Sequence, residues 1–217
     1  DLLVKLSIQL RLKKIRGKEA NHEHRISAQN AQLRDLTNRF KAELREAQTI
    51  QRALMPSTLP EDTSFSVAAR YIPLEAVGGD FYDVFMRSES QLCIFIADVT
   101  GHGLPAAFVG AMGKMALAYA KDDSPEEIFY SMNNGLAPHM PDNRFITGAI
   151  CLYDVSTGSL RLSSAGHPPA LIFRAATAKL EIPELRGLPL GVVEDAPYSS
   201  FETTLAPGDK FVLYTDR

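Results

Sequence analysis

The first 56 residues repeat apolar side chains at a heptad spacing, and this pattern predicts one long helix. Steps of alternately four and three residues, begun at Ile8, meet ten apolar and four polar side chains in fourteen positions. A stripe of two positions in seven is too narrow to cover a globular core and is typical of a coiled-coil seam. The last three heptads, residues 33–54, are the most regular and predict a homodimer through this segment. The fourteen positions are Ile8, Leu12, Ile15, Glu19, His22, Ile26, Gln29, Leu33, Leu36, Phe40, Glu43, Ala47, Ile50 and Leu54.

Other interpretations of this front segment stay open. A long surface helix packed on its own domain would also show an apolar stripe. The basic residues between Arg11 and Lys18 suit either a solvated helix face, which we favour, or a juxtamembrane segment attracted to anionic lipid. Glu19, His22 and Gln29 interrupt the stripe and predict a weak, adjustable stretch of the coiled coil.

The prolines at positions 56 and 60 end the helix, because proline lacks the backbone N–H and biases the residue before it away from helical angles. We therefore predict a helical module at residues 1–56 and a second module at residues 57–217. Beyond residue 64 the pattern becomes alternating or forms short apolar runs, which is typical of strands. Strands are expected at residues 65–71, 81–86, 91–99, 145–154, 159–164, 169–173, 199–205 and 210–215, and helices at 104–120 and 124–137.

Strands followed by two helices and then by more strands predict an α+β body with antiparallel sheets. The three stretches between residues 145 and 173 are expected to pair as successive neighbours in a meander. Ser124, followed by Pro125 and Glu127, predicts the start of the second body helix through a capping box.

Charge separates the two modules as clearly as the hydrophobic pattern does. Residues 1–56 hold 12 Lys and Arg against 6 Asp and Glu, a net charge of +6, whereas the remaining residues hold 11 against 20, a net charge of −9. An acidic body disfavours nucleic-acid binding, because phosphate backbones are held by Lys and Arg. This argues against a metal-dependent nuclease, while the same negative charge suits the binding of cations.

Cys93 and Cys151 each lie inside an apolar run, so we expect two buried thiols rather than a disulfide or a zinc cluster. The longest apolar runs are far shorter than the roughly 18 residues of a membrane-spanning helix. We therefore expect no membrane segment within the chain and a reducing, cytoplasmic location. Because the chain starts at Asp1, we expect a piece of a longer protein, which leaves room for a membrane anchor upstream.

Aspartates at the ends of apolar strands are the main chemical signal. Asp80 follows a pair of glycines and precedes a strand, and Asp98 and Asp216 each close an apolar run. An aspartate at the end of a buried strand is costly unless it is paired or binds a cation. Three such carboxylates suit hard divalent metals, and a metal-activated water would then be the natural nucleophile. Each aspartate also has a structural interpretation: Asp98 as a cap of the next helix, Asp80 as a turn residue, and Asp216 as an exposed strand end.

Five short motifs follow one another along the second module. They are AVGGDFYDV at 76–84, IADVTGHGLPAA at 96–107, SAGHPP at 164–169, GLPLG at 187–191 and LYTD at 213–216. In this order they resemble the bacterial SpoIIE/RsbU branch of the PPM serine/threonine phosphatases. The preceding segment QTIQRALMP, at residues 48–56, is similar to the usual helical linker of that family.

The resemblance implies a fold, a metal centre and an activity. The implied fold is an α-β-β-α sandwich of antiparallel sheets behind the long helix. A binuclear Mn²⁺ or Mg²⁺ centre would be held by Asp80, Asp98 and Asp216, with Asp98 bridging the two metals and the carbonyl of Val99 as a further ligand. These three aspartates are then the implied catalytic residues of a protein-serine/threonine phosphatase.

The resemblance also implies partners. The substrate would be a phosphorylated regulatory protein, typically an anti-sigma-factor antagonist, and an upstream sensory domain would control the activity through the helical linker. The alternative is a catalytically silent dimeric signalling module that binds a regulator without hydrolysing it. The intact Asp80 and Asp98 favour the enzyme, because a decayed site tends to lose its ligands.

Two histidines and the last residues of the chain also bear on the resemblance to this family. His102 is interpreted as a structural residue at a helix start, with a role as general acid as the alternative, and His167 as a turn or packing residue. The family continues Thr-Asp-Gly where this chain has Arg217, and then carries a further segment with another metal-binding aspartate. We therefore expect the C-terminal part of the domain to be missing, and metal occupancy and activity to depend on it.

Overall fold

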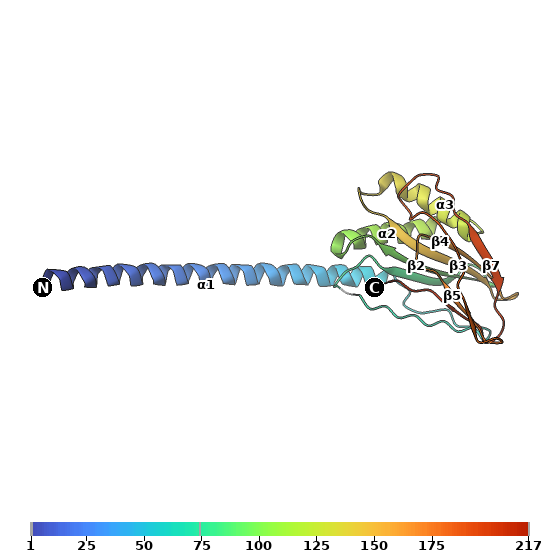
Figure 1. The fold of residues 1–217 in the computed structure, drawn as a ribbon, viewed down its shortest axis with the longest axis horizontal. Helices are drawn as coiled ribbons and strands as arrows, with labels where there is room; N and C mark the ends of the chain where they lie inside the picture. The colour runs from blue at the N-terminus through green and yellow to red at the C-terminus, as the bar shows by residue number, and fades with distance from the viewer. Residues whose placement is uncertain (1, 74, 217) are drawn as a thin grey trace. The chain divides into compact units, whose positions relative to one another are not determined.

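The computed structural model describes residues 2–73 and 75–216, which fall into two compact units, Asp1–Glu46 and Ala47–Arg217 (Figure 1). The first unit is helical, and the second holds the last turns of the same helix together with the α+β body. The elements in chain order are α1 (Leu2–Ala53), β1 (Phe81–Met86), β2 (Gln91–Val99), α2 (Gly103–Tyr119), α3 (Pro125–Leu136), the 3-10 helix η1 (Ala137–His139), β3 (Ile146–Asp154), β4 (Ser159–Ala165), β5 (Leu171–Arg174), β6 (Lys179–Glu181), β7 (Ser200–Thr204) and β8 (Lys210–Val212).

Helix α1 runs without a break and ends three residues before Pro56, as the prolines predict. Its described seam side chains expose apolar surface, and Leu33, Phe40 and Ile50 are each more than half exposed. The seam positions 12, 15 and 19 lie outside the described side chains. Among the described residues, no helix carries a stretch long and apolar enough to cross a membrane.

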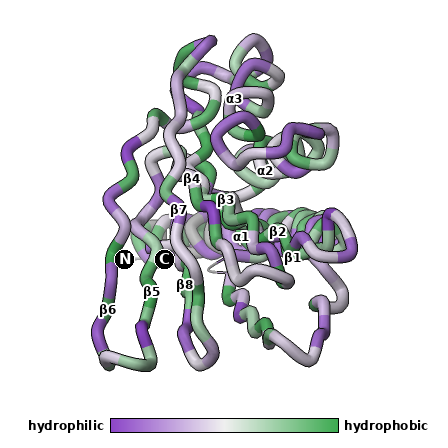
Figure 2. The backbone as a smooth tube through the Cα atoms, turned by 90° about the vertical axis from the view of Figure 1, so that its right-hand side faces the viewer, coloured by the Kyte–Doolittle hydropathy of each residue, from purple (hydrophilic) through white to green (hydrophobic). Residues whose placement is uncertain are grey.

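The body contains two antiparallel sheets in the described part of the chain. Five strands form one sheet in the order β1-β2-β3-β4-β7, and three form a second sheet in the order β6-β5-β8. The second sheet is visible in Figure 2, where β5, β6 and β8 lie side by side. The α+β class with antiparallel sheets is confirmed.

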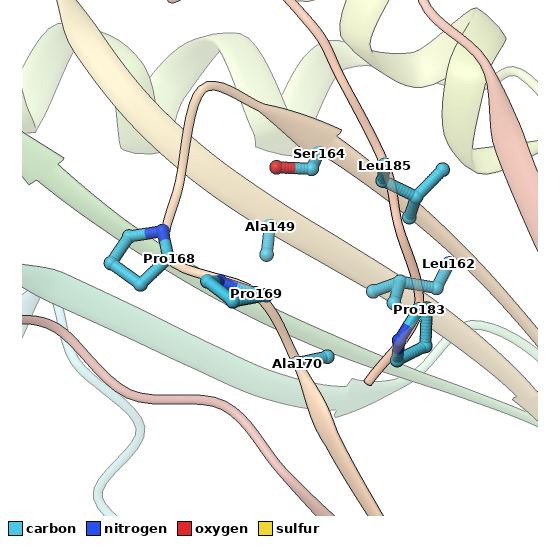
Figure 3. Close-up of a pocket in the computed structure, with 8 residues that line it drawn as sticks. All are labelled: Ala149, Leu162, Ser164, Pro168, Pro169, Ala170, Pro183 and Leu185. Carbon is cyan, nitrogen blue, oxygen red and sulfur yellow. The ribbon is translucent and has the colours of Figure 1, made fainter. Parts of the chain in front are cut away.

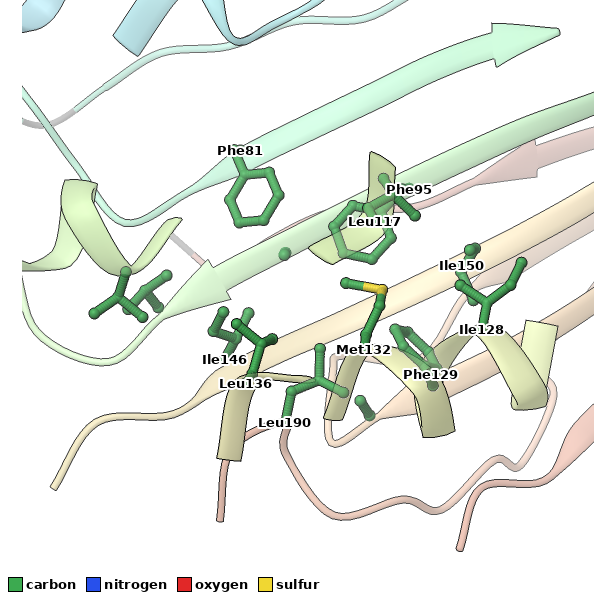
Figure 4. Close-up of a cluster of buried hydrophobic side chains, with 14 of the residues drawn as sticks. Phe81, Phe95, Leu117, Ile128, Phe129, Met132, Leu136, Ile146, Ile150 and Leu190 are labelled. Carbon is green, nitrogen blue, oxygen red and sulfur yellow. The ribbon is translucent and has the colours of Figure 1, made fainter. Parts of the chain in front are cut away.

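Helices α2 and α3 lie together on one face of the five-stranded sheet (Figure 1). The main core fills the space between these two helices and the sheet. Figure 4 shows Phe95 and Ile150 of the sheet facing Phe129 and Met132 of α3. A second, smaller core lies between the two sheets and includes Cys151. Among the described residues both body helices cover the same face, so the structure shows the α, β and β layers of the predicted sandwich.

Local signals explain the two body helices. Ser124 caps α3, and its hydroxyl oxygen accepts the backbone N–H of Glu127, as the capping box predicts. The Glu127 carboxylate accepts a hydrogen bond from the Ser124 hydroxyl (2.9 Å), so the two side chains also bind each other. On α2, Lys114 forms an ion pair with Asp83 of β1, and both side chains are largely buried.

Both cysteines are free and fully buried, as predicted. Burial raises the pKa of the Cys93 thiol to about 12 and raises the pKa of Cys151 well above its ordinary value. A thiol with so high a pKa stays protonated and inert at neutral pH.

Two strand predictions are wrong. Residues 65–71 form no strand, although Phe65 and Val67 are half-buried and their neighbours exposed, because the extended segment packs its alternate side chains without joining a ladder. The predicted meander fails at its third stretch, since β4 pairs with β7 and β5 belongs to the other sheet. Gly166, with φ of 68°, turns the chain out of the first sheet, and the prolines that follow cannot donate to its ladder.

A small pocket lies where the chain crosses between the sheets (Figure 3). Its volume is about 10 Å³, which is room for one water molecule at most. The lining is mostly apolar, with the Ser164 hydroxyl as an exception, so this pocket is a packing gap and not a substrate site.

Candidate functional site

Strands β1 and β2 bring Asp80 and Asp98 together. Phe81 pairs with Ala97, and the same antiparallel register continued by one residue sets Asp80 opposite Asp98. Side chains that lie opposite each other on neighbouring strands have Cβ atoms about 5 Å apart. Both aspartates are half-buried. Two of the three predicted carboxylates therefore lie side by side at one end of the sheet.

Gly79 allows this arrangement because the backbone at this position touches two neighbouring elements. A Cβ atom on Gly79 would lie 2.7 Å from the carbonyl oxygen of Val99, closer than any real contact of that kind. On the other side, a Cβ atom on Gly110 of α2 would lie 3.3 Å from the Gly79 carbonyl oxygen. The glycines thus let β2 and α2 approach the turn that carries Asp80.

We expect Gly79→Ala to destabilise the protein by about 1–3 kcal/mol, because the added methyl group overpacks against the backbone of Val99. Urea denaturation measures this change in the free energy of unfolding. Gly135→Ala on α3 is the matched control, since a Cβ atom there meets nothing within 4 Å. It should leave stability unchanged or raise it slightly through helix propensity. Equal stabilities of the two variants would contradict the predicted close approach at Gly79.

The Asp80 carboxylate is only partly satisfied within the described residues. Its Oδ2 accepts a long hydrogen bond from the Thr215 hydroxyl (3.4 Å). Its Oδ1 is buried and has no hydrogen-bond partner among the described residues. An unpartnered buried carboxylate oxygen is costly, and a bound cation would remove that cost.

His167 lies close to this pair of carboxylates. It occupies the turn, where its N–H donates to the Ser164 hydroxyl (3.2 Å), so the predicted turn role is confirmed. Its side chain is also buried, and the Thr147 hydroxyl joins its Nδ1 (3.1 Å) to the Asp98 carbonyl oxygen (3.4 Å). Sequence reasoning missed this approach, for which the only signal is the SAGHPP motif itself.

Burial lowers the pKa of His167, and the Tyr214 carbonyl and the carboxylates of Asp98 and Asp216 act in the opposite direction. Asp216 is exposed and follows Thr215, the residue that contacts Asp80. The third predicted carboxylate therefore belongs to the residue next to the one that contacts Asp80. Within residues 2–73 and 75–216, however, no three His, Cys, Asp or Glu side chains are grouped so as to hold a metal ion. Arg217, where the family pattern departs, lies outside the described residues.

His102 stands at the N-cap position of α2, in agreement with a place at the helix start. Its side chain makes no capping hydrogen bond and is highly exposed. Instead its Nδ1 lies 3.2 Å from a carboxylate oxygen of Glu75. The sequence did not predict this contact, which joins His102 to the loop that precedes Asp80.

The sequence model described as Stage II sporulation protein E (SpoIIE) matches residues 88–216, more than half of the chain. The chain belongs to the SpoIIE family. The matched range includes Asp98, Val99, His167 and Asp216, and it begins after Asp80. The domain is thus a PP2C-type phosphatase domain of the SpoIIE kind, as the five motifs predict.

A curated relative is consistent with membership of the SpoIIE family. Phosphoserine phosphatase RsbU of Bacillus subtilis is 29% identical over 190 residues, which cover 85% of this chain and 55% of the relative. The chain thus spans about half the length of that relative.

Two solved structures show the same fold. The RsbU and RsbW domains of a Mycobacterium tuberculosis protein match with 28% identity and a TM-score of 0.56, over 67% of this chain and 40% of that one. The SiaA-PP2C domain of Pseudomonas aeruginosa matches with 21% identity and a TM-score of 0.66, over 81% of this chain and 71% of that one, which supports the fold alone.

SpoIIE-type phosphatases are metal-dependent, and the residues present fit a hard divalent cation in their chemistry. Asp80 offers a buried carboxylate oxygen without a partner among the described residues, and Asp98 stands opposite it on the next strand. Carboxylate and carbonyl oxygens are the ligands that Mg²⁺ and Mn²⁺ prefer. The fit therefore rests on the donor set and on the buried Asp80 oxygen.

Proposed function

We propose that this chain carries the catalytic domain of a metal-dependent phosphatase that removes phosphate from Ser or Thr of a regulatory protein. The observation that carries this proposal is the position of Asp80 and Asp98 directly beside the last β1–β2 pair, together with a buried Asp80 oxygen that has no hydrogen-bond partner among the described residues. Membership of the SpoIIE family and the name of the relative RsbU support the same chemistry.

Asp80, Asp98, Asp216 and the Val99 carbonyl are the proposed metal ligands. Divalent cations bound there would polarise the phosphoryl oxygens and activate a water molecule for attack on phosphorus. The protein's own contribution is to hold the carboxylates in place. The β1–β2 ladder ends at the pair of Phe81 with Ala97, directly beside Asp80 and Asp98, and buried Val99 packs against Gly79. Thr147 ties the Asp98 backbone to His167, which limits movement of the second strand end.

The substrate we propose is a phosphorylated anti-sigma-factor antagonist or a similar regulator. The acidic body, with its net charge of −9, would repel a phosphate that approached without cations. Proposed partners are therefore the metals, the phosphoprotein and a second copy of the chain. The exposed apolar seam of α1 between residues 33 and 54 supports that second copy.

Phosphate release by the full-length protein tests this function. We expect hydrolysis of a phosphoserine protein and of a generic phosphate ester with Mn²⁺ present, and no hydrolysis after chelation of the metal. A protein that binds the phosphoprotein at saturating Mn²⁺ but releases no phosphate from either substrate is a silent binding module. That result would overturn the proposed activity.

We also propose that α1 transmits a signal from an upstream sensory domain. The helix runs through the boundary between the units without a flexible linker, and an unbroken helix transmits rotation where a Gly/Ser linker would not. Its polar interruptions provide a seam with more than one packing, as a switch requires.

Inserting one residue near position 45 should rotate the helix segment after the insertion by about 100° relative to the segment before it. We expect this rotation to change the signal-dependent rate of phosphate release strongly. A flexible Gly-Ser insertion at residues 55–58 should leave a fixed rate that ignores the signal. Phosphate release by the full-length protein, with and without its signal, measures both. Signal dependence that survives both insertions would show that the helix is only a tether.

A further inference from the structure

The last turn of α1 holds the turn that carries Asp80 through one side chain. The Gln51 amide nitrogen donates to the Gly78 carbonyl oxygen (2.5 Å), and the Gln51 amide oxygen accepts the Gly78 N–H (3.2 Å). Both backbone groups of one residue are thus bound by one side-chain amide, 27 positions earlier in the chain. Gln51 and Gly78 belong to the same compact unit.

This contact suits a glutamine in particular. A primary amide carries both a donor and an acceptor on one planar group, so it can bind a backbone N–H and C=O at once. Gly78 lies before β1, the edge strand of its sheet, and outside the β1–β2 ladder that begins at Phe81. Gly78 is partly buried, and Gln51 supplies partners for both of its backbone polar groups.

Other contacts converge on the same turn. Gly79 is enclosed by Val99 of β2, and Thr215 binds the Asp80 carboxylate. The Tyr71 hydroxyl lies 3.8 Å from the position of a Cβ atom on Gly78. Burial and the charge of Asp80 raise the pKa of Tyr71, and Arg52 opposes them. Arg52, in the last turn of α1, and Asp80 therefore both lie within electrostatic reach of the Tyr71 hydroxyl.

We propose that Gln51 is a positioning residue that fixes Gly78, and through it Asp80, in the geometry that holds a divalent cation. The affinity for metal then depends on the last turn of α1 being folded against the body. The consequences for metal binding and for catalysis rest on the proposed function, whereas the consequence for the Gly78 backbone does not. Gln51 itself touches neither substrate nor metal.

The test compares Gln51→Met with Gln48→Met in the full-length protein. Methionine keeps the length and helix propensity of glutamine and removes both hydrogen bonds. Gln48 is the matched control, because it is half-buried on the same helix, about one turn earlier. Three quantities are measured: hydrogen exchange of the Gly78 amide without metal, Mn²⁺ binding by calorimetry, and phosphate release as a function of Mn²⁺ concentration.

We expect Gln51→Met to speed exchange at Gly78 and to weaken Mn²⁺ binding by about 10-fold or more, the range seen when a residue that supports a metal ligand is removed. The rate at saturating Mn²⁺ should stay close to wild type, because excess metal restores the geometry. Gln48→Met should change none of the three.

Unchanged exchange at Gly78 and unchanged Mn²⁺ binding in Gln51→Met would overturn the proposal. Equal losses in Gln48→Met would also overturn it, since they would show a general loosening of the helix. If wild type releases no phosphate, the proposed function fails, and exchange at Gly78 still decides whether Gln51 fixes the backbone there. Thermal unfolding confirms that each variant is folded, and Gln51→Ala provides a second substitution for the same measurements.

Discussion

Replacing Asp98 by asparagine should reduce phosphate release by more than about 100-fold while leaving the fold intact. Asp98 ends β2, stands opposite Asp80 and is the proposed bridging ligand, so its loss weakens every cation in the site. Asparagine has the same shape, which preserves the pairing of Asp98 with Thr147 in the β2–β3 ladder. Removing one preorganised group that stabilises developing charge costs about 10²–10³ in rate, and a lost metal ligand should cost at least as much.

Hydrolysis of a phosphoserine protein by the full-length variant at saturating Mn²⁺ measures this effect, and circular dichroism checks the fold. Asp142→Asn is the matched control, because Asp142 is an exposed aspartate of the same body, before β3. It should behave like wild type. Wild-type turnover in Asp98→Asn would remove Asp98 from the catalytic site.

The double substitution Phe40→Glu and Ile50→Glu should convert a dimer into monomers. Both side chains lie on the seam and are more than half exposed in the single chain. Burying each is worth about 1.5–3 kcal/mol, and two copies bury four such side chains. We therefore expect the dimer dissociation constant to rise at least about 1,000-fold, with charge repulsion between the new glutamates adding to the loss.

Light scattering over a range of protein concentrations measures this change. The control is Asn38→Glu with Ala42→Glu, which adds the same charge at exposed positions of α1 off the seam. The control should remain dimeric. A double seam variant that also remains dimeric would place the contact between copies elsewhere.

Strands with a strong apolar pattern were predicted to the residue. Strands β1 and β2 match the sequence prediction, because each is an apolar run bounded by polar turn residues. Strand β6 was missed, since Lys179–Glu181 is three residues long and mostly exposed, and so it carries no periodic signal. The extended residues 65–71 show the opposite error, because alternation records which side chains are buried and not whether the backbone joins a sheet.

The site was predictable where it depends on strand ends. Asp80 and Asp98 could be paired in advance, since consecutive antiparallel strands with a short turn bring such positions together. The contacts of Gln51 with Gly78 and of His167 with Thr147 were not predictable. They join residues 27 and 20 positions apart through side chains, and no spacing rule marks such pairs.

Crystals of the full-length protein grown with Mn²⁺ and measured at the manganese absorption edge test the proposed centre most directly. We expect anomalous density between the carboxylates of Asp80 and Asp98, with the Val99 carbonyl and Asp216 within coordination distance. The same measurement on Asp98→Asn should show that density lost or strongly reduced. Manganese bound only elsewhere on the protein, with none at Asp80 and Asp98, would contradict the assignment of these carboxylates as the metal centre.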